Sequence, residues 1–182
     1  MQFAIEPIAQ NGLPRREREH EAVDSLIHGN ISPTARLEHF SDGSPYIPDC
    51  PYNISLSHSR RFAALAWSDK ANVGIDVEEP RFAQLERVAS RFLTENEKIG
   101  MDDYPTFLLK VWTLKEAAFK ALRNGPVDFR QYQVCGDKIL VDGAELEVLF
   151  SDFIRDDLFC SIVACDTQKE IEKQNGGEEE GD

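Results

Sequence analysis

Short runs of alternating or wholly apolar positions follow one another through the first half of the chain, a pattern that predicts consecutive β-strands. The predicted strands lie within residues 1–12 and over residues 35–40, 53–57, 62–67 and 73–77. Phe3 and Ile5 alternate in the first of them and Pro7 closes it, so we expect an edge strand there. After this strand, Pro14 opens a charged helix that is predicted over residues 15–28.

Helical spacing of apolar residues then takes over for the middle of the chain. Residues 85–92 show this spacing, and Thr94 and Glu97 form a capping-box pattern that begins a new helical turn. A longer helix is predicted from Pro105 to Arg123. Four antiparallel strands are expected after it, over residues 131–134, 139–141, 146–150 and 158–164. The order of strands, helices and strands predicts an α+β fold.

Charge narrows the classes of partner. The chain has 182 residues and a formal net charge of −13. An acidic protein is a poor general ligand for nucleic acid or for an anionic membrane surface, so we expect neither partner. Acidic residues without apolar neighbours dominate the C-terminal end, so residues 167–182 are predicted to be a disordered acidic tail.

The four cysteines favour a reducing compartment. None of them has Cys-x-x-Cys spacing, and two lie in a predicted apolar strand, so they are expected to be reduced thiols. The sequence contains neither a signal-peptide pattern nor a long apolar run. A cytoplasmic protein is therefore expected.

Two carboxylates project from the end of a predicted buried strand. Asp76 and Glu78 are two residues apart, so they point to the same face of that strand. Two adjacent carboxylates need a cation, and Mg²⁺ suits oxygen ligands when phosphates complete its shell. The alternative is a strand that simply runs out into solvent, because acids at strand ends are common.

A carboxylate and an amine share one face of the long predicted helix. Glu116 and Lys120 are four residues apart, and Lys115 precedes Glu116. A solvated salt bridge on an amphipathic helix is the alternative explanation.

A third polar segment follows the predicted strand at residues 53–57. It contains Ser57, His58 and Arg60, and hydroxyl, imidazole and guanidinium groups together suit a phosphate. An exposed polar strand end would have the same composition.

The order of these three segments is more specific than any one of them. Gly74-Ile75-Asp76 is followed, forty residues after the aspartate, by Glu116 in the helical segment Trp112-Thr-Leu-Lys-Glu-Ala-Ala-Phe-Lys120. This arrangement resembles the 4′-phosphopantetheinyl transferase superfamily. The context resembles its surfactin-synthetase-activating type, with Gly43-Ser-Pro45 similar to that type's Gly-Lys-Pro segment and Ser55–Ser59 similar to its Ser-x-Ser-His segment.

The resemblance implies an activity and a set of roles. The activity is Mg²⁺-dependent transfer of the 4′-phosphopantetheine group from coenzyme A to a serine of an apo acyl or peptidyl carrier protein, releasing 3′,5′-ADP. The implied metal ligands are Asp76, Glu78 and Glu116, the implied catalytic residues are Glu116 and Lys120, and the implied coenzyme A ligands are Ser57, His58, Arg60 and Lys120. Either Glu116 or a water on the metal could take the serine proton.

The resemblance also implies the architecture. We expect two lobes of antiparallel strands and helices related by a pseudo-twofold axis, the first lobe abbreviated, in a monomer. Residues 1–57 are assigned to the N-terminal lobe and residues 58–166 to the C-terminal lobe that carries the metal and coenzyme A residues. Ser44 stands where many relatives carry a lysine, and Arg60 or Arg61 could compensate.

Two matters stay open at this point. A noncatalytic module that binds coenzyme A or a carrier protein is the alternative function, although all three carboxylates are present. The sequence does not say which carrier or pathway is served, nor whether acyl-coenzyme A is accepted.

An acidic enzyme also needs a basic face to meet an acidic carrier. That face is predicted from Arg60, Arg61, Arg87, Arg91, Lys110, Lys115, Lys120 and Arg123.

Overall fold

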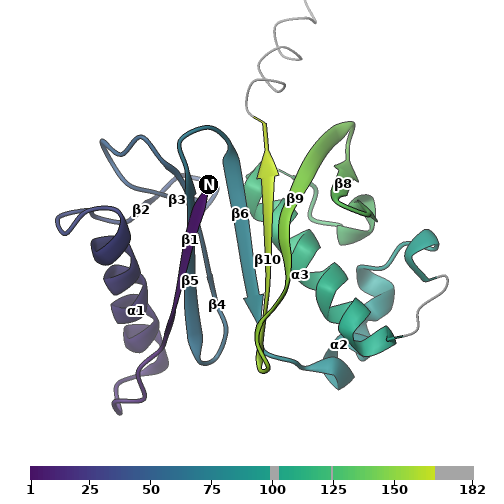
Figure 1. Ribbon diagram of the computed structural model, residues 1–182, viewed down its shortest axis with the longest axis horizontal. Helices are drawn as coiled ribbons and strands as arrows, with labels where there is room; N and C mark the ends of the chain where they lie inside the picture. Colours follow the sequence, from purple (N-terminus) through teal and green to yellow (C-terminus); the bar gives the residue numbers. More distant parts are fainter. Residues whose placement is uncertain (99–102, 124, 167–182) are drawn as a thin grey trace, which may run out of the picture.

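The computed structural model describes residues 1–98, 103–123 and 125–166. Its two larger sheets lie side by side, and each is covered by a long helix (Figure 1). The predicted tail at residues 167–182 lies outside the described residues. Within the described part of the chain, no helix is long and apolar enough to cross a membrane. The sheets and their covering helices give the structure the α+β composition that the sequence predicts.

The first sheet has three strands in the order β1-β5-β4. They are β1 (Gln2–Pro7), β4 (Asn53–His58) and β5 (Phe62–Ser68), and helix α1 (Arg15–Asn30) packs on them. A small hairpin of β2 (Glu38–His39) and β3 (Pro45–Tyr46) lies between α1 and β4 along the chain. The edge strand expected at the N-terminus is β1, which pairs antiparallel with β5.

The second sheet has five strands in the order β6-β10-β9-β8-β7. They are β6 (Asn72–Glu78), β7 (Gln133–Cys135), β8 (Lys138–Val141), β9 (Ala144–Arg155) and β10 (Leu158–Cys165). Helix α3 (Tyr104–Leu122) packs on this sheet, and α2 (Phe82–Val88) packs on α3. Three short 3₁₀ turns, η1 (Ala89–Arg91), η2 (Asn96–Lys98) and η3 (Phe129–Gln131), complete the described elements.

The two halves repeat one topology. In the first, strand β1 is followed by α1 and then by β4 and β5, and the last strand lies in the middle of the three. In the second, β6 is followed by α3 and then by β9 and β10, and again the last strand lies between the other two. This repeat agrees with two related lobes, although no repeat of residue identity marks it in the sequence.

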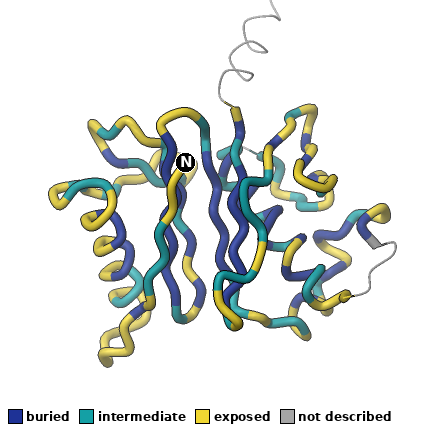
Figure 2. The backbone as a smooth tube through the Cα atoms, in the orientation of Figure 1, coloured by how far each residue is buried: buried dark blue, intermediate teal, exposed yellow. Residues whose placement is uncertain are grey.

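Strand β5 joins the two halves because it is buried on both faces. All seven of its residues are buried (Figure 2). Ala63, Leu65 and Trp67 belong to the core beneath α1, whereas Phe62 and Ala64 pack with β6 and β10. The strand follows residue 57, so its pairing with β1 and β4 places part of residues 58–166 in the first sheet. The lobe boundary at residue 57 stays a prediction.

Candidate active site

A glycine allows strand β6 and helix α3 to approach closely. A Cβ atom at Gly74 would lie 1.8 Å from the carbonyl oxygen of Ala117 and 2.8 Å from the backbone nitrogen of Ala121. Both obstacles are main-chain atoms, so only glycine fits between this strand and this helix. The contact sets Asp76, two residues further along β6, beside the face of α3 that carries Lys120.

Asp76 is a buried carboxylate whose two oxygens differ: one accepts hydrogen bonds, and the other, called the bare oxygen below, has no hydrogen-bond partner among the described residues. Its Oδ1 lies 2.8 Å from Lys120 Nζ and accepts a hydrogen bond from Ser57 Oγ at 2.9 Å. Lys120 also donates to the carbonyl oxygen of Ile75 at 3.0 Å. Asp76 Oδ2 is buried and has no hydrogen-bond partner among the described residues. A buried carboxylate oxygen without a partner is costly and calls for a cation or a donor.

Glu78 leaves the same strand beside an arginine. Arg81 Nε lies 2.6 Å from Glu78 Oε2, and Arg81 Nη2 donates to Glu78 Oε1 at 2.9 Å. Burial raises the pKa of Glu78 to about 7, against the opposing effect of Arg81 and with the support of the Asp76 and Glu116 charges. Sequence reasoning missed Arg81, which stands three residues after Glu78 in the loop that leads to α2.

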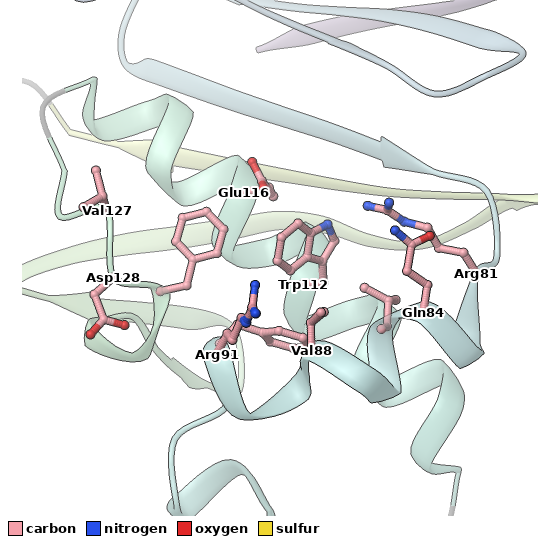
Figure 3. A pocket seen from close by; sticks show the side chains of 11 residues that line it. Arg81, Gln84, Val88, Arg91, Trp112, Glu116, Val127 and Asp128 are labelled. Atoms are coloured by element: carbon pink, nitrogen blue, oxygen red, sulfur yellow. The ribbon is translucent and has the colours of Figure 1, made fainter.

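Glu116 lines a cavity of about 470 Å³, together with apolar residues that include Leu85 and Trp112. Figure 3 shows its carboxylate at one wall of this cavity, above Trp112, with Arg81 toward one end and Asp128 toward the other. Burial raises the pKa of Glu116 to about 7, and the charge of Asp76 raises it further, whereas Lys120 and Arg81 oppose the shift. No hydrogen bond or ion pair to the Glu116 carboxylate is present within the described part of the chain.

The three carboxylates therefore gather in one region and repel one another. Among the described residues, no group of three or more His, Cys, Asp or Glu side chains is arranged so that it could hold a metal ion. Instead, Lys120 forms an ion pair with Asp76, and Arg81 forms one with Glu78. The bare Asp76 oxygen, the raised pKa values of both glutamates and the all-oxygen donor set nevertheless fit a hard divalent cation.

A second groove adjoins the cavity, because Arg81 and Gln84 line both. Its volume is about 750 Å³, and its lining includes His58, Arg60 and Glu78. The structure thus brings two of the predicted coenzyme A ligands to the same groove as one predicted metal ligand. His58 is exposed, with Nδ1 3.6 Å from Glu19 Oε1, and Arg60 is exposed and makes no ion pair with a described residue.

Arg61, one of the two arginines expected to compensate for a lysine at position 44, is paired with two acidic residues. Its guanidinium forms ion pairs with Glu79 and Asp157, so its charge is already neutralised. Ser44 instead lines a smaller groove of about 230 Å³ together with Lys120 and Arg123. Lys120 and Arg123 are therefore the two cations that line the groove of Ser44.

Arg123 is fixed from two sides. Arg123 Nη2 donates to Asn53 Oδ1 at 3.2 Å, and the guanidinium lies 5.2 Å from the centre of the Phe40 ring. Its backbone has a φ of 60°, an uncommon conformation for a residue other than glycine. Neither contact could have been found from the spacing of residues in the sequence.

Lys115 was expected to belong to the basic face, and the structure shows that this expectation is wrong. The side chain is completely buried, with Nζ 2.7 Å from Glu97 Oε2 and 2.7 Å from the carbonyl oxygen of Phe92. It lies on the inner side of α3, so it cannot contribute to a surface. Half of the expected capping box forms on the same glutamate, because the backbone N–H of Thr94 donates to Glu97 Oε2 at 2.8 Å. The other half does not form, since Thr94 Oγ1 is buried and has no hydrogen-bond partner among the described residues.

Comparisons with a family model and with known proteins lead to the same family. Residues 72–164 match the family model described as the 4′-phosphopantetheinyl transferase superfamily. Over 115 residues the chain is 35% identical to the 4′-phosphopantetheinyl transferase AcpT of Escherichia coli strain K12 and to that of strain O157:H7, covering 59% of this chain and 58% of each relative. It is 27% identical over 180 residues to 4′-phosphopantetheinyl transferase pptA of Paxillus involutus, covering 76% of this chain and 68% of that protein.

The extent of these matches matters for the site. The chain spans a little under three-fifths of the length of the first of these relatives, 58%. The residues matched by the family model include Asp76, Glu78, Glu116 and Lys120, whereas Ser57, His58 and Arg60 precede them. The match therefore covers the predicted metal ligands but not the predicted phosphate-binding segment.

Proposed function

The chain belongs to the 4′-phosphopantetheinyl transferase superfamily, and we propose that it transfers the 4′-phosphopantetheine group of coenzyme A to a serine of an apo carrier protein. One observation carries this proposal. Lys120 of α3 lies 2.8 Å from Asp76 of β6, beside Glu78 and Glu116, so a cation and three carboxylates meet where two elements of the matched region cross. Such a set is suited to a pyrophosphate and its counter-ion.

We propose that Asp76, Glu78 and Glu116 hold Mg²⁺. Asp76 offers the buried Oδ2 that has no partner among the described residues, and Glu116 offers a carboxylate without an ion pair among them. Glu78 would exchange its ion pair with Arg81 for the metal. When bound, the metal ion would neutralise the pyrophosphate and stabilise the charge that develops on the leaving phosphate.

The proposed reaction is a displacement at phosphorus. The carrier serine oxygen forms a bond to the phosphorus that bears the pantetheine oxygen, the bond from this phosphorus to the bridging oxygen breaks, and 3′,5′-ADP leaves. Lys120 is placed to stabilise the leaving phosphate because its amine can donate more than one hydrogen bond. The serine proton would pass either to Glu116 or to a water molecule at the metal site.

The nucleotide part of coenzyme A is proposed to bind in the groove of His58 and Arg60. Arg60 is exposed without an ion pair among the described residues, and guanidinium groups bind phosphate through charge-assisted hydrogen bonds. Arg15 lines the same groove, so we propose it as a further ligand of the 3′-phosphate. Arg123 beside Ser44 is placed to supply the positive charge of the absent lysine.

The carrier protein is proposed to approach over the cavity that contains Glu116. Arg91 lines this cavity and is exposed, so it can meet an acidic partner. Cys50, Cys135 and Cys160 are free thiols, which supports a reducing, cytoplasmic location. Two lobes within one chain provide the whole proposed site, so we propose that the protein works as a monomer.

Release of 3′,5′-ADP tests the proposal. The protein, coenzyme A, Mg²⁺ and an apo carrier protein are incubated, and 3′,5′-ADP is quantified by chromatography. Asp76→Asn should reduce the rate by at least about 100-fold, because it removes a charged ligand of the metal. Asp152→Asn, a change at an exposed aspartate of β9, is the matched control and should leave the rate unchanged. Equal rates for both variants would contradict the proposed site.

A further inference from the structure

Two serine hydroxyls join the edges of the two sheets. Strand β4 is the edge of the first sheet and β6 the edge of the second. Ser55 Oγ accepts a hydrogen bond from the backbone N–H of Ile75 at 3.1 Å, and Ser57 Oγ accepts one from Val77 at 3.2 Å. Both serines are buried and point to the same face of β4 because they are two residues apart. They satisfy backbone donors that would otherwise be unpaired between the lobes.

Ser57 has one contact that Ser55 does not have. Its hydroxyl donates to Asp76 Oδ1 at 2.9 Å, on the oxygen that Lys120 also contacts. A serine hydroxyl has a single proton to donate, and here it is directed at a carboxylate. Two donors on Oδ1 fix the plane of the Asp76 carboxylate, and Oδ2 is left as the bare oxygen.

We infer that Ser57 is a positioning residue for Asp76, rather than a ligand of the coenzyme A phosphate; this inference rests on the proposed function. Ser57 is only 7% exposed. A phosphate within hydrogen-bond reach of Ser57 Oγ would need the proton that Asp76 already receives. It would also lie against the Asp76 carboxylate, and two like charges at that separation repel.

The fixed orientation of Asp76 has a consequence for metal binding. Mg²⁺ demands near-ideal octahedral geometry, so a ligand oxygen must point in one direction. Groups that orient a metal ligand typically change metal affinity by about 10- to 100-fold when they are removed. Loss of the Ser57 hydroxyl should therefore weaken the binding of the metal ion, while the residues that bind the phosphates stay in place.

Ser55 offers a matched control within the same strand. It has the same residue type, the same face, similar burial and a similar bond to the β6 backbone, but it makes no hydrogen bond to Asp76. Ser57→Ala and Ser55→Ala thus share the loss of a bond between the lobes. Only Ser57→Ala also frees the Asp76 carboxylate.

Three dissociation constants test the inference. The binding of Mn²⁺, as a probe for Mg²⁺, is followed by electron paramagnetic resonance of the free ion, and the binding of coenzyme A and of 3′-dephospho-coenzyme A is followed by calorimetry with chelator present. We expect Ser57→Ala to raise the Mn²⁺ dissociation constant by about 10- to 100-fold. Ser55→Ala should leave this constant within about twofold of wild type, and the ratio of the two coenzyme A constants should not change in either variant.

Other outcomes would overturn the inference. If Ser57→Ala brings the two coenzyme A constants together and leaves Mn²⁺ binding intact, Ser57 binds the 3′-phosphate. If both alanine variants weaken Mn²⁺ binding equally, the two serine hydroxyls only join the lobes. Should the alanine variants fail to fold, the nearly isosteric Ser57→Cys and Ser55→Cys replace them, with the same expected contrast. Failure of the proposed function is seen separately, as wild-type protein that releases no 3′,5′-ADP with any carrier.

Discussion

Gly74 of strand β6 has no room for a side chain, because its Cβ would lie 1.8 Å from the carbonyl oxygen of Ala117 in helix α3. The crossing of strand and helix at this point sets Asp76 against Lys120. The glycine of the Gly-Ile-Asp motif is thus required by packing, and the aspartate by charge. A change at the glycine should disturb both stability and the site.

Gly74→Ala is expected to lower the free energy of unfolding by about 1–3 kcal/mol or more, since overpacking against main-chain atoms leaves little freedom to relax. Gly29→Ala is the control, because a Cβ at that position of α1 meets nothing within 4 Å. It should be neutral or slightly stabilising, as alanine favours helix over glycine. Chemical denaturation of both variants measures the difference, and equal stability would contradict the packing argument.

The raised pKa values of Glu78 and Glu116 make the metal-free protein sensitive to pH. Both values are about 7 in the folded state, above the ordinary value of 4.5. The folded protein then binds more protons than the unfolded chain between these values, so stability falls as pH rises from about 4.5 to about 7. A divalent cation that binds the carboxylates should restore stability at the upper end of this range.

Glu116→Gln removes one of the repelling charges, so it should stabilise the metal-free protein at pH 8 relative to wild type. It should have little effect at pH 4.5, where the wild-type glutamate is protonated. Addition of Mg²⁺ at pH 8 should raise the melting temperature of wild type more than that of the variant. Thermal melts at the two pH values, with and without Mg²⁺, measure these differences, and a variant that melts below wild type at pH 8 would contradict the account.

Lys115 and Glu97 form a buried ion pair 2.7 Å apart that ties α3 to η2. Burial lowers the pKa of Lys115, and Glu97 opposes that shift. Lys115→Met leaves a buried carboxylate without its partner and should cost about 3–5 kcal/mol of stability. The double variant Lys115→Met/Glu97→Gln should recover part of this loss, and a single variant as stable as wild type would contradict the role of the pair.

Arg87 and Arg91 are exposed at the end of α2 and in η1, and Arg91 lines the cavity beside Glu116. Changing both to alanine should slow modification of an acidic carrier by about 10-fold at low salt, because electrostatic steering is lost. Coenzyme A affinity should change little. Lys70→Ala, at an exposed lysine of the β5–β6 turn, is the control. Carrier kinetics and coenzyme A calorimetry separate the two effects, and equal losses in both would contradict a carrier-facing role.

The sequence predicted the elements of the site better than their contacts. The strand at residues 73–77 and the helix from Pro105 to Arg123 correspond to β6 and α3, because apolar periodicity is strong in both. The single strand expected at residues 35–40 is instead the first arm of the β2–β3 hairpin. Strand β9 is also longer than residues 146–150, since its pairing with β10 continues past two irregularities of register.

Long-range partners were beyond sequence reasoning. Lys115 looked like a surface lysine because its partner Glu97 lies 18 residues away and on another element. The contact of Ser57 with Asp76 was likewise not predictable, because it depends on how the two sheets meet. Pairings of this kind come from tertiary packing, which residue spacing within one element does not contain.

Intact-mass spectrometry of an apo carrier protein tests the central claim most directly. The carrier is incubated with coenzyme A, Mg²⁺ and either wild type, Glu116→Gln or the control Glu86→Gln, which changes an exposed glutamate of α2. We expect the carrier to gain the mass of one phosphopantetheine group with wild type and with Glu86→Gln. Glu116→Gln, or wild type with chelator, should slow that gain by at least about 100-fold. An unmodified carrier with wild type, across several carrier types and with coenzyme A still bound, would contradict the account and favour a noncatalytic binding module.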